Sequence, residues 1–175
     1  MAIATHTHAA LTALKDALAA ATGVPQSLTE IAAGGGPTLT APLIYEIRET
    51  GAAAIDVLGR TIAQESPSAS SGRLPRCVVG IGGDPEQDDW LSAARDNVIP
   101  IEVMIESHGS DLPLTADQQA EYYARAIDAA VTRRVRAGIG AGVWNVDVTF
   151  TGIRAAGNRR MGTVEGLLYQ RTTRE

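Results

Sequence analysis

Cys77 is the only cysteine in this chain of 175 residues, so it is the first residue to consider for nucleophilic chemistry. A cysteine nucleophile needs a neighbouring base that takes its proton. The three histidines, His6, His8 and His108, show no informative spacing to Cys77. Because Cys77 lies in the apolar run RCVVGIGG, we expect a buried, small hydrophobic side chain with a structural role.

Two groups of residues carry side chains of the metal-binding type. His6 and His8 stand two residues apart at the start of a predicted helix and have no third partner nearby, so we expect no metal there. The acidic run Asp84, Glu86, Asp88 and Asp89 lacks the correctly placed glycine and closing glutamate of a calcium loop. We therefore predict a solvated acidic loop over this run.

Three glycine-rich stretches were candidates for phosphate or nucleotide binding. VGIGGDP and AGIGAG do not place G-x-G-x-x-G between a strand and a helix, and no Lys-Ser or Lys-Thr follows AAGGGP. No G-x-S-x-G motif is present either. We predict no cofactor, no metal and no catalytic residues, although a triad assembled from distant positions stays open as an alternative.

The composition is that of one globular domain, with 45% hydrophobic and 20% charged residues. No run of about 18 apolar residues occurs, so we expect no membrane-spanning helix and no membrane partner. The first residues do not have the pattern of a signal peptide. A net charge of −5 argues against general nucleic-acid binding, although the arginines cluster late in the chain.

The first part of the chain is predicted from its hydrophobic periodicity. Leu11, Leu14 and Leu18 recur at helical spacing, which predicts a helix over 5–22. Residues 24–40 contain a glycine cluster and are predicted to form a loop. Residues 42–65 fit either a helix or a hairpin, and we favour the helix. The polar run 66–72 is a predicted linker.

The second part has a clearer pattern. We predict strands in RLPRCVVGIGG and VIPIEVMIES with an acidic excursion between them, then a helix that begins with a capping box at Thr115 and Gln118 and ends at Gly138. Trp144, Val146, Val148 and Phe150 alternate with polar residues, which predicts a half-buried strand. The loop RAAGNRR, over residues 154–160, then leads into a returning strand.

This order predicts one α+β domain, with an antiparallel sheet of about four strands and two or three helices packed on one face. Residues 1–72 would form an N-terminal helix with a variable segment and linker. Residues 73–175 would form the α+β core with its C-terminal β-hairpin.

The charges on this predicted sheet favour an interaction surface. We expect an acidic outward face from Glu102, Glu106 and Asp147, and a basic hairpin tip and tail from Arg154, Arg159, Arg160, Arg171 and Arg174. One positive end and one negative face suit head-to-tail association of identical subunits, which closes into a ring. Ordinary solvation of a surface would produce the same charges.

The segments RLPRCVVGIGG, NVIPIEVMIES and AEYYARAIDAAVTRRVRAG, together with the closing hairpin, resemble the tail terminator proteins of tailed bacteriophages. The resemblance covers roughly 73–175. It implies a structural virion protein without enzymatic activity, in a hexameric ring that stops tail-tube growth. Its implied partners are other copies of itself, the tail tube protein and the head–tail connector protein.

The resemblance also implies that DNA would pass through the lumen of the ring, where arginines could contact its phosphates. Residues 24–72 depart from the family pattern. This departure leaves open another neck, connector or tail-completion component. A further alternative is a small hydrolase or ligand-binding domain that uses Cys77 or a triad assembled in space.

Overall fold

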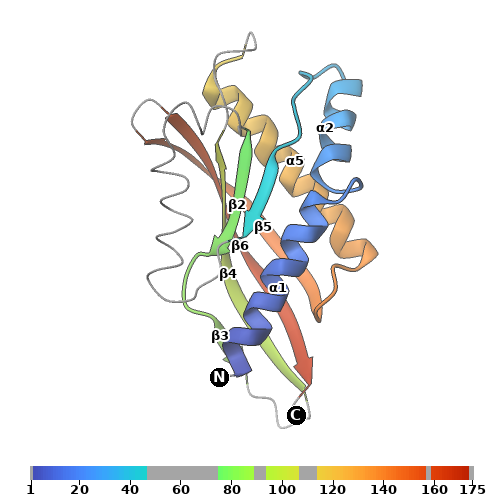
Figure 1. Ribbon diagram of the computed structural model, residues 1–175, viewed down its shortest axis with the longest axis vertical. Helices are drawn as coiled ribbons and strands as arrows, with labels where there is room; N and C mark the ends of the chain where they lie inside the picture. The colour runs from blue at the N-terminus through green and yellow to red at the C-terminus, as the bar shows by residue number, and fades with distance from the viewer. Residues whose placement is uncertain (1, 47–74, 89–93, 107–113, 157–158, 174–175) are drawn as a thin grey trace.

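The computed structural model describes residues 2–46, 75–88, 94–106, 114–156 and 159–173 (Figure 1). The helices are α1 (Ala2–Ala19), α2 (Val24–Ala33) and α5 (Ala116–Ala137). The strands are β1 (Leu43–Glu46), β2 (Arg76–Ile81), β3 (Glu86–Asp88), β4 (Ala94–Glu106), β5 (Val143–Ala156) and β6 (Arg159–Thr173).

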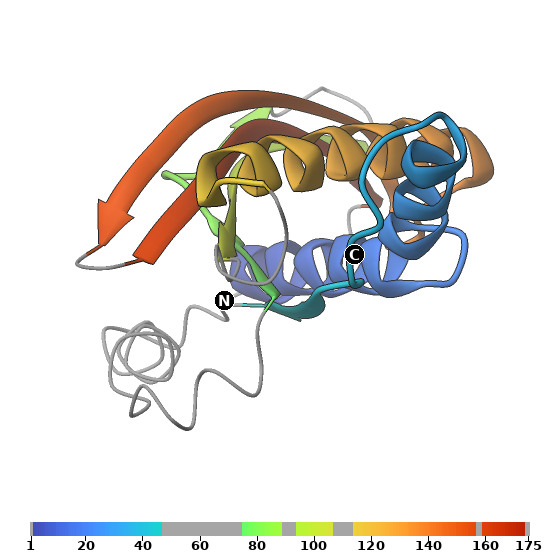
Figure 2. The same cartoon turned by 90° about the horizontal axis from the view of Figure 1, so that it is seen from above.

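The strands form one sheet in the order β1-β2-β4-β6-β5, and β3 pairs with the first part of β4. All described pairs are antiparallel except β1 with β2. Helices α1 and α5 pack on this sheet, and α2 packs against α5. The hairpin of β5 and β6 curves over α5 with its tip extending beyond the helix (Figure 2). The predicted α+β class is confirmed. Its four long strands are supplemented by the short strands β1 and β3.

The core lies between the helices and one face of the sheet. Ile99, Ile101, Val103 and Ile105 alternate along β4, and all four are buried in the same cluster as the leucines of α1. Gly162 of β6 lies directly beneath α5, because a Cβ atom at this position would be 3.0 Å from the Cβ atom of Ala120. The glycine therefore lets the helix approach the sheet closely.

Helix α2 corrects the prediction of a loop from residue 24. Val24 and Leu28 lie one turn apart and are buried, and Pro25 occupies the first turn of the helix. Proline is tolerated there because the first amides of a helix have no partner within the helix. Pro25 therefore lies at the start of a helix in this chain, within the segment predicted to form a loop.

Three further boundaries differ from the predictions. The described part of 42–65 is the strand β1, so the favoured helix is wrong for Leu43–Glu46, and 47–65 lie outside the described residues, as does the predicted linker. The acidic excursion contains β3 and the start of β4. The predicted loop 154–160 is mostly strand, since β5 continues to Ala156 and β6 begins at Arg159.

The predicted capping of α5 is confirmed. The Thr115 hydroxyl accepts a hydrogen bond from the Gln118 amide at 3.2 Å, and the Gln118 side chain accepts one from the Thr115 amide at 3.0 Å. Near the other end, the Arg133 guanidinium donates to the Thr22 carbonyl at 3.1 Å and pairs with Glu30 of α2. Arg133 thus ties α5 to the turn between α1 and α2.

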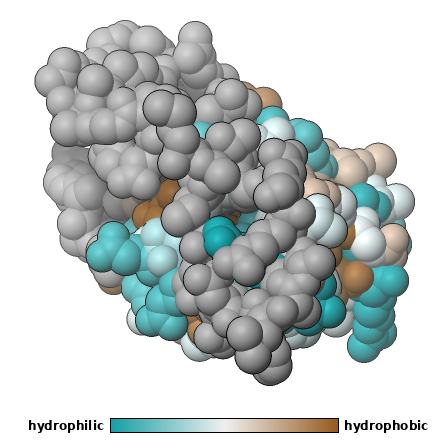
Figure 3. All heavy atoms as spheres, turned by 90° about the horizontal axis from the view of Figure 1, so that it is seen from below, coloured by the Kyte–Doolittle hydropathy of each residue, from teal (hydrophilic) through white to brown (hydrophobic). Residues whose placement is uncertain are grey.

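Among the helices that the structure describes, none is both long enough and apolar enough to cross a membrane. The described surface in Figure 3 is a mixture of hydrophilic residues and small, separate apolar patches.

Candidate subunit interface

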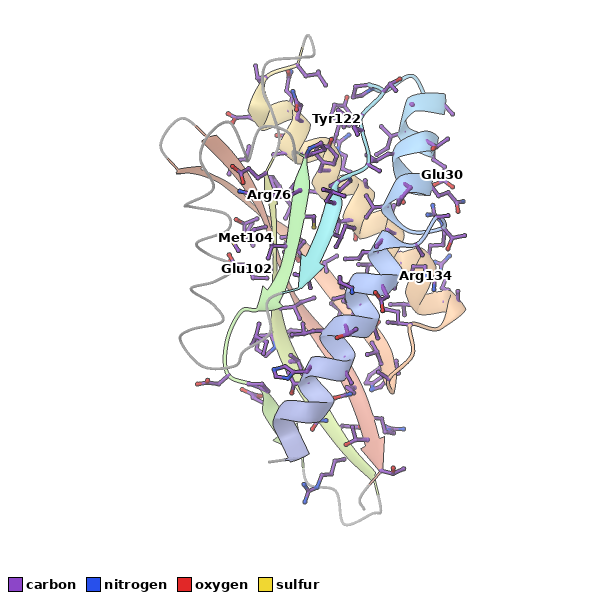
Figure 4. All side chains as sticks on the ribbon, in the orientation of Figure 1. Glu30, Arg76, Glu102, Met104, Tyr122 and Arg134 are labelled. Carbon is purple, nitrogen blue, oxygen red and sulfur yellow. The ribbon has the colours of Figure 1, made fainter. Side chains whose placement is uncertain are left out.

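The two faces of the sheet have different surroundings. One, here called the helix face, carries the core residues of β4 together with Val164 and Leu168 of β6. Side chains alternate along a strand, so the residues between these point to the other side, here called the opposite face. Figure 4 shows Arg76, Glu102 and Met104 on the opposite face and Glu30 and Arg134 among the helices.

The three predicted acidic residues all belong to the opposite face, but they are not one exposed surface. Asp147 is exposed, and its carboxylate accepts a hydrogen bond from Asn145 at 3.2 Å. Glu102 is half-buried and lies directly across from Glu165 in the register of β4 and β6. Glu106 is a correction, because it is buried and its carboxylate pairs with the Arg76 guanidinium at 2.7 Å.

The Arg76–Glu106 pair joins β2 to β4 at one end of the opposite face. Both side chains are almost fully buried, with 3% and 4% of their surfaces exposed. A buried ion needs a close partner, since leaving water costs it several kcal/mol. Glu106 therefore has a structural role within the subunit, as the buried partner of Arg76.

The predicted arginines fall into two separated groups. Arg154, Arg159 and Arg160 lie in the strands at the hairpin tip, and their side chains are outside the described part of the structure, as is Arg174. Arg171 lies twelve residues along β6 from Arg159, which corresponds to about 40 Å in an extended strand. Arg171, in the predicted tail, therefore lies far from the arginines of the hairpin tip.

Arg171 forms a two-pronged ion pair within its own chain. Its Nε and Nη2 atoms donate to Oδ1 and Oδ2 of Asp96 at 2.7 and 2.8 Å. This hydrogen bonding from Arg171 lowers the pKa of the Asp96 carboxyl below its ordinary value. The guanidinium is still largely exposed, so Arg171 could meet a partner only as part of this pair.

Exposed apolar side chains are the feature that sequence reasoning missed. The large hydrophobic residues with exposed surfaces, among those described, are Leu43 (51%), Trp144 (53%), Phe150 (38%) and Leu167 (39%). Three of them lie on the β5–β6 hairpin and the fourth on β1. In the sheet order, β1 and β5 are the two end strands.

The side chain of Trp144 lies outside the core because a β-bulge interrupts the alternation of β5 at this position. The alternation predicted that Trp144 would share a buried face with Val146 and Val148. A register shift between Val143 and Asn145 instead brings its ring against Tyr169, with centroids 5.3 Å apart. Tyr169 lies on the opposite face, next to the buried Leu168. A single-residue bulge of this kind has no clear signal in the sequence.

Phe150 lines a groove between α5 and β5. The groove has a volume of about 430 Å³, and its walls include Ala124, Val148, Phe150 and the charged residues Glu121, Arg125 and Asp128. Val164 of β6, which pairs with Phe150 on the helix face of the sheet, also lines it. An apolar side chain from another segment could therefore be covered there together with Phe150.

The side chains considered for catalysis are placed as follows. Cys77 is fully buried, as predicted, and burial raises the pKa of its thiol to about 12. Tyr123 is also buried, and desolvation raises the pKa of its hydroxyl to about 12 while it donates to the Thr40 carbonyl. Within the described ranges, no cluster of three or more His, Cys, Asp or Glu residues could hold a metal ion.

His8 is half-buried on α1, whereas the side chain of His6 and all of His108 lie outside the described part. The chain matches no family model and no curated protein sequence.

Proposed function

We propose that this protein is a structural subunit that assembles with copies of itself into a ring of the tail terminator kind. In this role the ring would sit at the head-proximal end of a phage tail tube and join it to the head connector protein. The observation that carries the proposal is the placement of exposed apolar side chains at both ends of the sheet. Large apolar side chains exposed on the end strands would lose contact with water if a neighbouring subunit covered them.

The arrangement of these residues favours a head-to-tail contact. Leu43 lies on one end strand, and Trp144 and Phe150 lie on the other. A contact that uses two different surfaces of each subunit repeats with every added copy, and it closes into a ring when the rotation permits. The resemblance to tail terminators supplies the hexamer, the tail tube and the connector as further parts of this proposal.

Negative-stain electron microscopy of the purified protein tests the proposal at the level of shape. We expect uniform rings with an open lumen, and class averages of these particles with six-fold symmetry. Particles without a lumen, at protein concentrations where assembly is complete, would contradict a ring that caps a tube. In native mass spectrometry, a monomer that carries the extra mass of a bound molecule in stoichiometric amount would favour the ligand-binding alternative.

The hairpin tip supplies a second test, because its arginines are candidates for contact with a neighbouring subunit or the tube. Reversing both Arg159 and Arg160 to glutamate should reduce the ringed fraction while leaving the circular dichroism spectrum unchanged. The matched control reverses Lys15 and Arg136, which carry the same charge but lie on helices. Equal ring formation by both double variants would exclude a role for the tip charges.

A further inference from the structure

The two end strands of the sheet have free outer edges in the part of the chain that the structure describes. On β1, the Leu43 amide donates to the Pro75 carbonyl at 3.0 Å. Successive residues of a strand direct their backbone groups to alternate sides, so those of Ile44 and Glu46 point away from β2. An edge of this kind is a template for pairing with another strand.

The outer edge of β5 has a regular segment of matching size. Residues Asn145–Phe150 pair with β6 in continuous register, and a register shift lies on each side of this segment. Its only charged residue is Asp147, and it contains no lysine and no proline. Lysine, proline and bulges are the usual means of blocking an edge strand. The six regular residues leave room for the four residues of β1.

Each of the two edges also has apolar side chains on both the helix face and the opposite face of the sheet. Leu43 pairs with Arg76 and therefore lies on the opposite face, whereas Ile44 packs against the core on the helix face. Trp144 lies on the opposite face, and Phe150 borders the groove on the helix face. With β1 of a second copy beside Asn145–Phe150, its Leu43 would lie among the side chains on the opposite face of β5, and its Ile44 among those on the helix face.

We propose that subunits join by pairing the outer edge of β1 in one copy with Asn145–Phe150 of β5 in the next, so that the sheet continues from subunit to subunit. This inference rests on the proposed self-assembly and specifies its interface. The contact is heterologous, because β1 and β5 are different strands. It would cover Leu43 of one copy and part of the exposed β5 edge of the next.

Disulfide trapping between single-cysteine variants tests the pairing directly. Adjacent strands place facing Cα atoms about 4.5–5.5 Å apart, which is within the range that a disulfide spans. The variants are Leu43→Cys on β1 and Asn145→Cys, Asp147→Cys or Thr149→Cys on the opposite face of β5. The native Cys77 can stay in place, because its thiol is buried with a pKa of about 12.

We expect the mixture of Leu43→Cys with at least one β5 variant to form a covalent dimer under mild oxidation. Each variant alone, and the wild-type protein, should form none. A chain carrying both cysteines should give a ladder of covalent oligomers that stops at the size of the closed ring. Dimers from a β5 variant alone would show β5 pairing with itself and would overturn the proposal.

Native mass spectrometry of the same samples distinguishes a failure of the edge pairing from a failure of self-assembly. An intact oligomer without any mixed disulfide, at all three β5 positions, would overturn the edge pairing but leave self-assembly standing. A monomer at every concentration would overturn both. As a second readout, hydrogen exchange of the Ile44 amide should slow at least tenfold on assembly, and unchanged exchange in an assembled sample would contradict the pairing.

Discussion

Leu167 and Leu168 are neighbours on β6, and they illustrate how differently the two faces of the sheet are used. Leu168 is fully buried beneath the helices, whereas Leu167 on the opposite face keeps 39% of its surface exposed. The opposite face also changes along the sheet, from the buried Arg76–Glu106 pair to the exposed Trp144. Buried positions specify the fold, and the exposed apolar positions near the hairpin are available to a partner.

The largest effect on the free energy of unfolding is expected from breaking the buried Arg76–Glu106 ion pair. Glu106→Ala leaves the Arg76 guanidinium without the carboxylate that lies 2.7 Å from it. Removing one partner of a buried pair costs about 3–5 kcal/mol of the free energy of unfolding. Urea denaturation followed by circular dichroism measures the loss. The control is Glu165→Ala, an exposed glutamate on the same face, and an equal loss in both variants would show that burial is not the cause.

The second prediction compares the two leucines. Leu168→Ala should lower the free energy of unfolding by about 2–5 kcal/mol, because it leaves a cavity under the helices. Leu167→Ala should change it by less than about 0.5 kcal/mol, as exposed substitutions usually do. Both variants are compared by denaturation at a concentration where the protein is monomeric. Similar losses for the two would mean that the opposite face is covered within the monomer.

A smaller effect on the free energy of unfolding is expected from replacing Gln170, whose side-chain amide is buried on the helix face. The Gln170 side chain accepts a hydrogen bond from Asn97 at 3.2 Å and donates to the Ala141 carbonyl at 2.9 Å. Gln170→Leu removes this partner from the buried Asn97 amide and from the Ala141 carbonyl, which costs about 1–3 kcal/mol of the free energy of unfolding. Thr173→Val, an exposed change in the same strand, is the control. A stabilised Gln170→Leu variant would contradict the assignment.

The smallest effect concerns Asp96 on the opposite face. Its pKa is lower in the folded state than in the unfolded state, where an aspartate titrates near about 3.9. The stabilisation by Arg171 is therefore complete above the unfolded pKa and is lost as the pH falls through the folded pKa. Wild type and Asp96→Asn should therefore converge in stability as the pH falls below the unfolded value and through the lower folded pKa. A constant difference from pH 6 to pH 2 would exclude this cause.

Periodicity and capping chemistry predicted the long elements well. The alternation of β4, the capping box of α5 and the burial of Cys77 all depend on local patterns, and all are confirmed. Helix α2 was missed because Pro25 and the glycines resemble a loop, although Val24 and Leu28 share a buried face. A proline has opposite meanings at the start and at the end of a helix.

The candidate interface was harder to predict than the fold. Charge alone placed Glu106 on the surface, because its partner Arg76 is thirty residues away and becomes its neighbour only through the register of β2 and β4. The exposure of Trp144 depends on a bulge that shifts one residue out of the alternating pattern. Both features follow from pairing between distant segments, which periodicity within one strand does not contain.

The central claim is that the apolar residues exposed at the sheet ends drive self-assembly. Native mass spectrometry over a concentration series tests this claim most directly, using the wild type and a Leu43→Ser, Trp144→Ser double variant with one substitution on each end strand. We predict one dominant closed oligomer for the wild type and a folded monomer for the variant at the same concentrations. A wild-type monomer throughout, or an oligomer that survives both substitutions unchanged, would contradict the account.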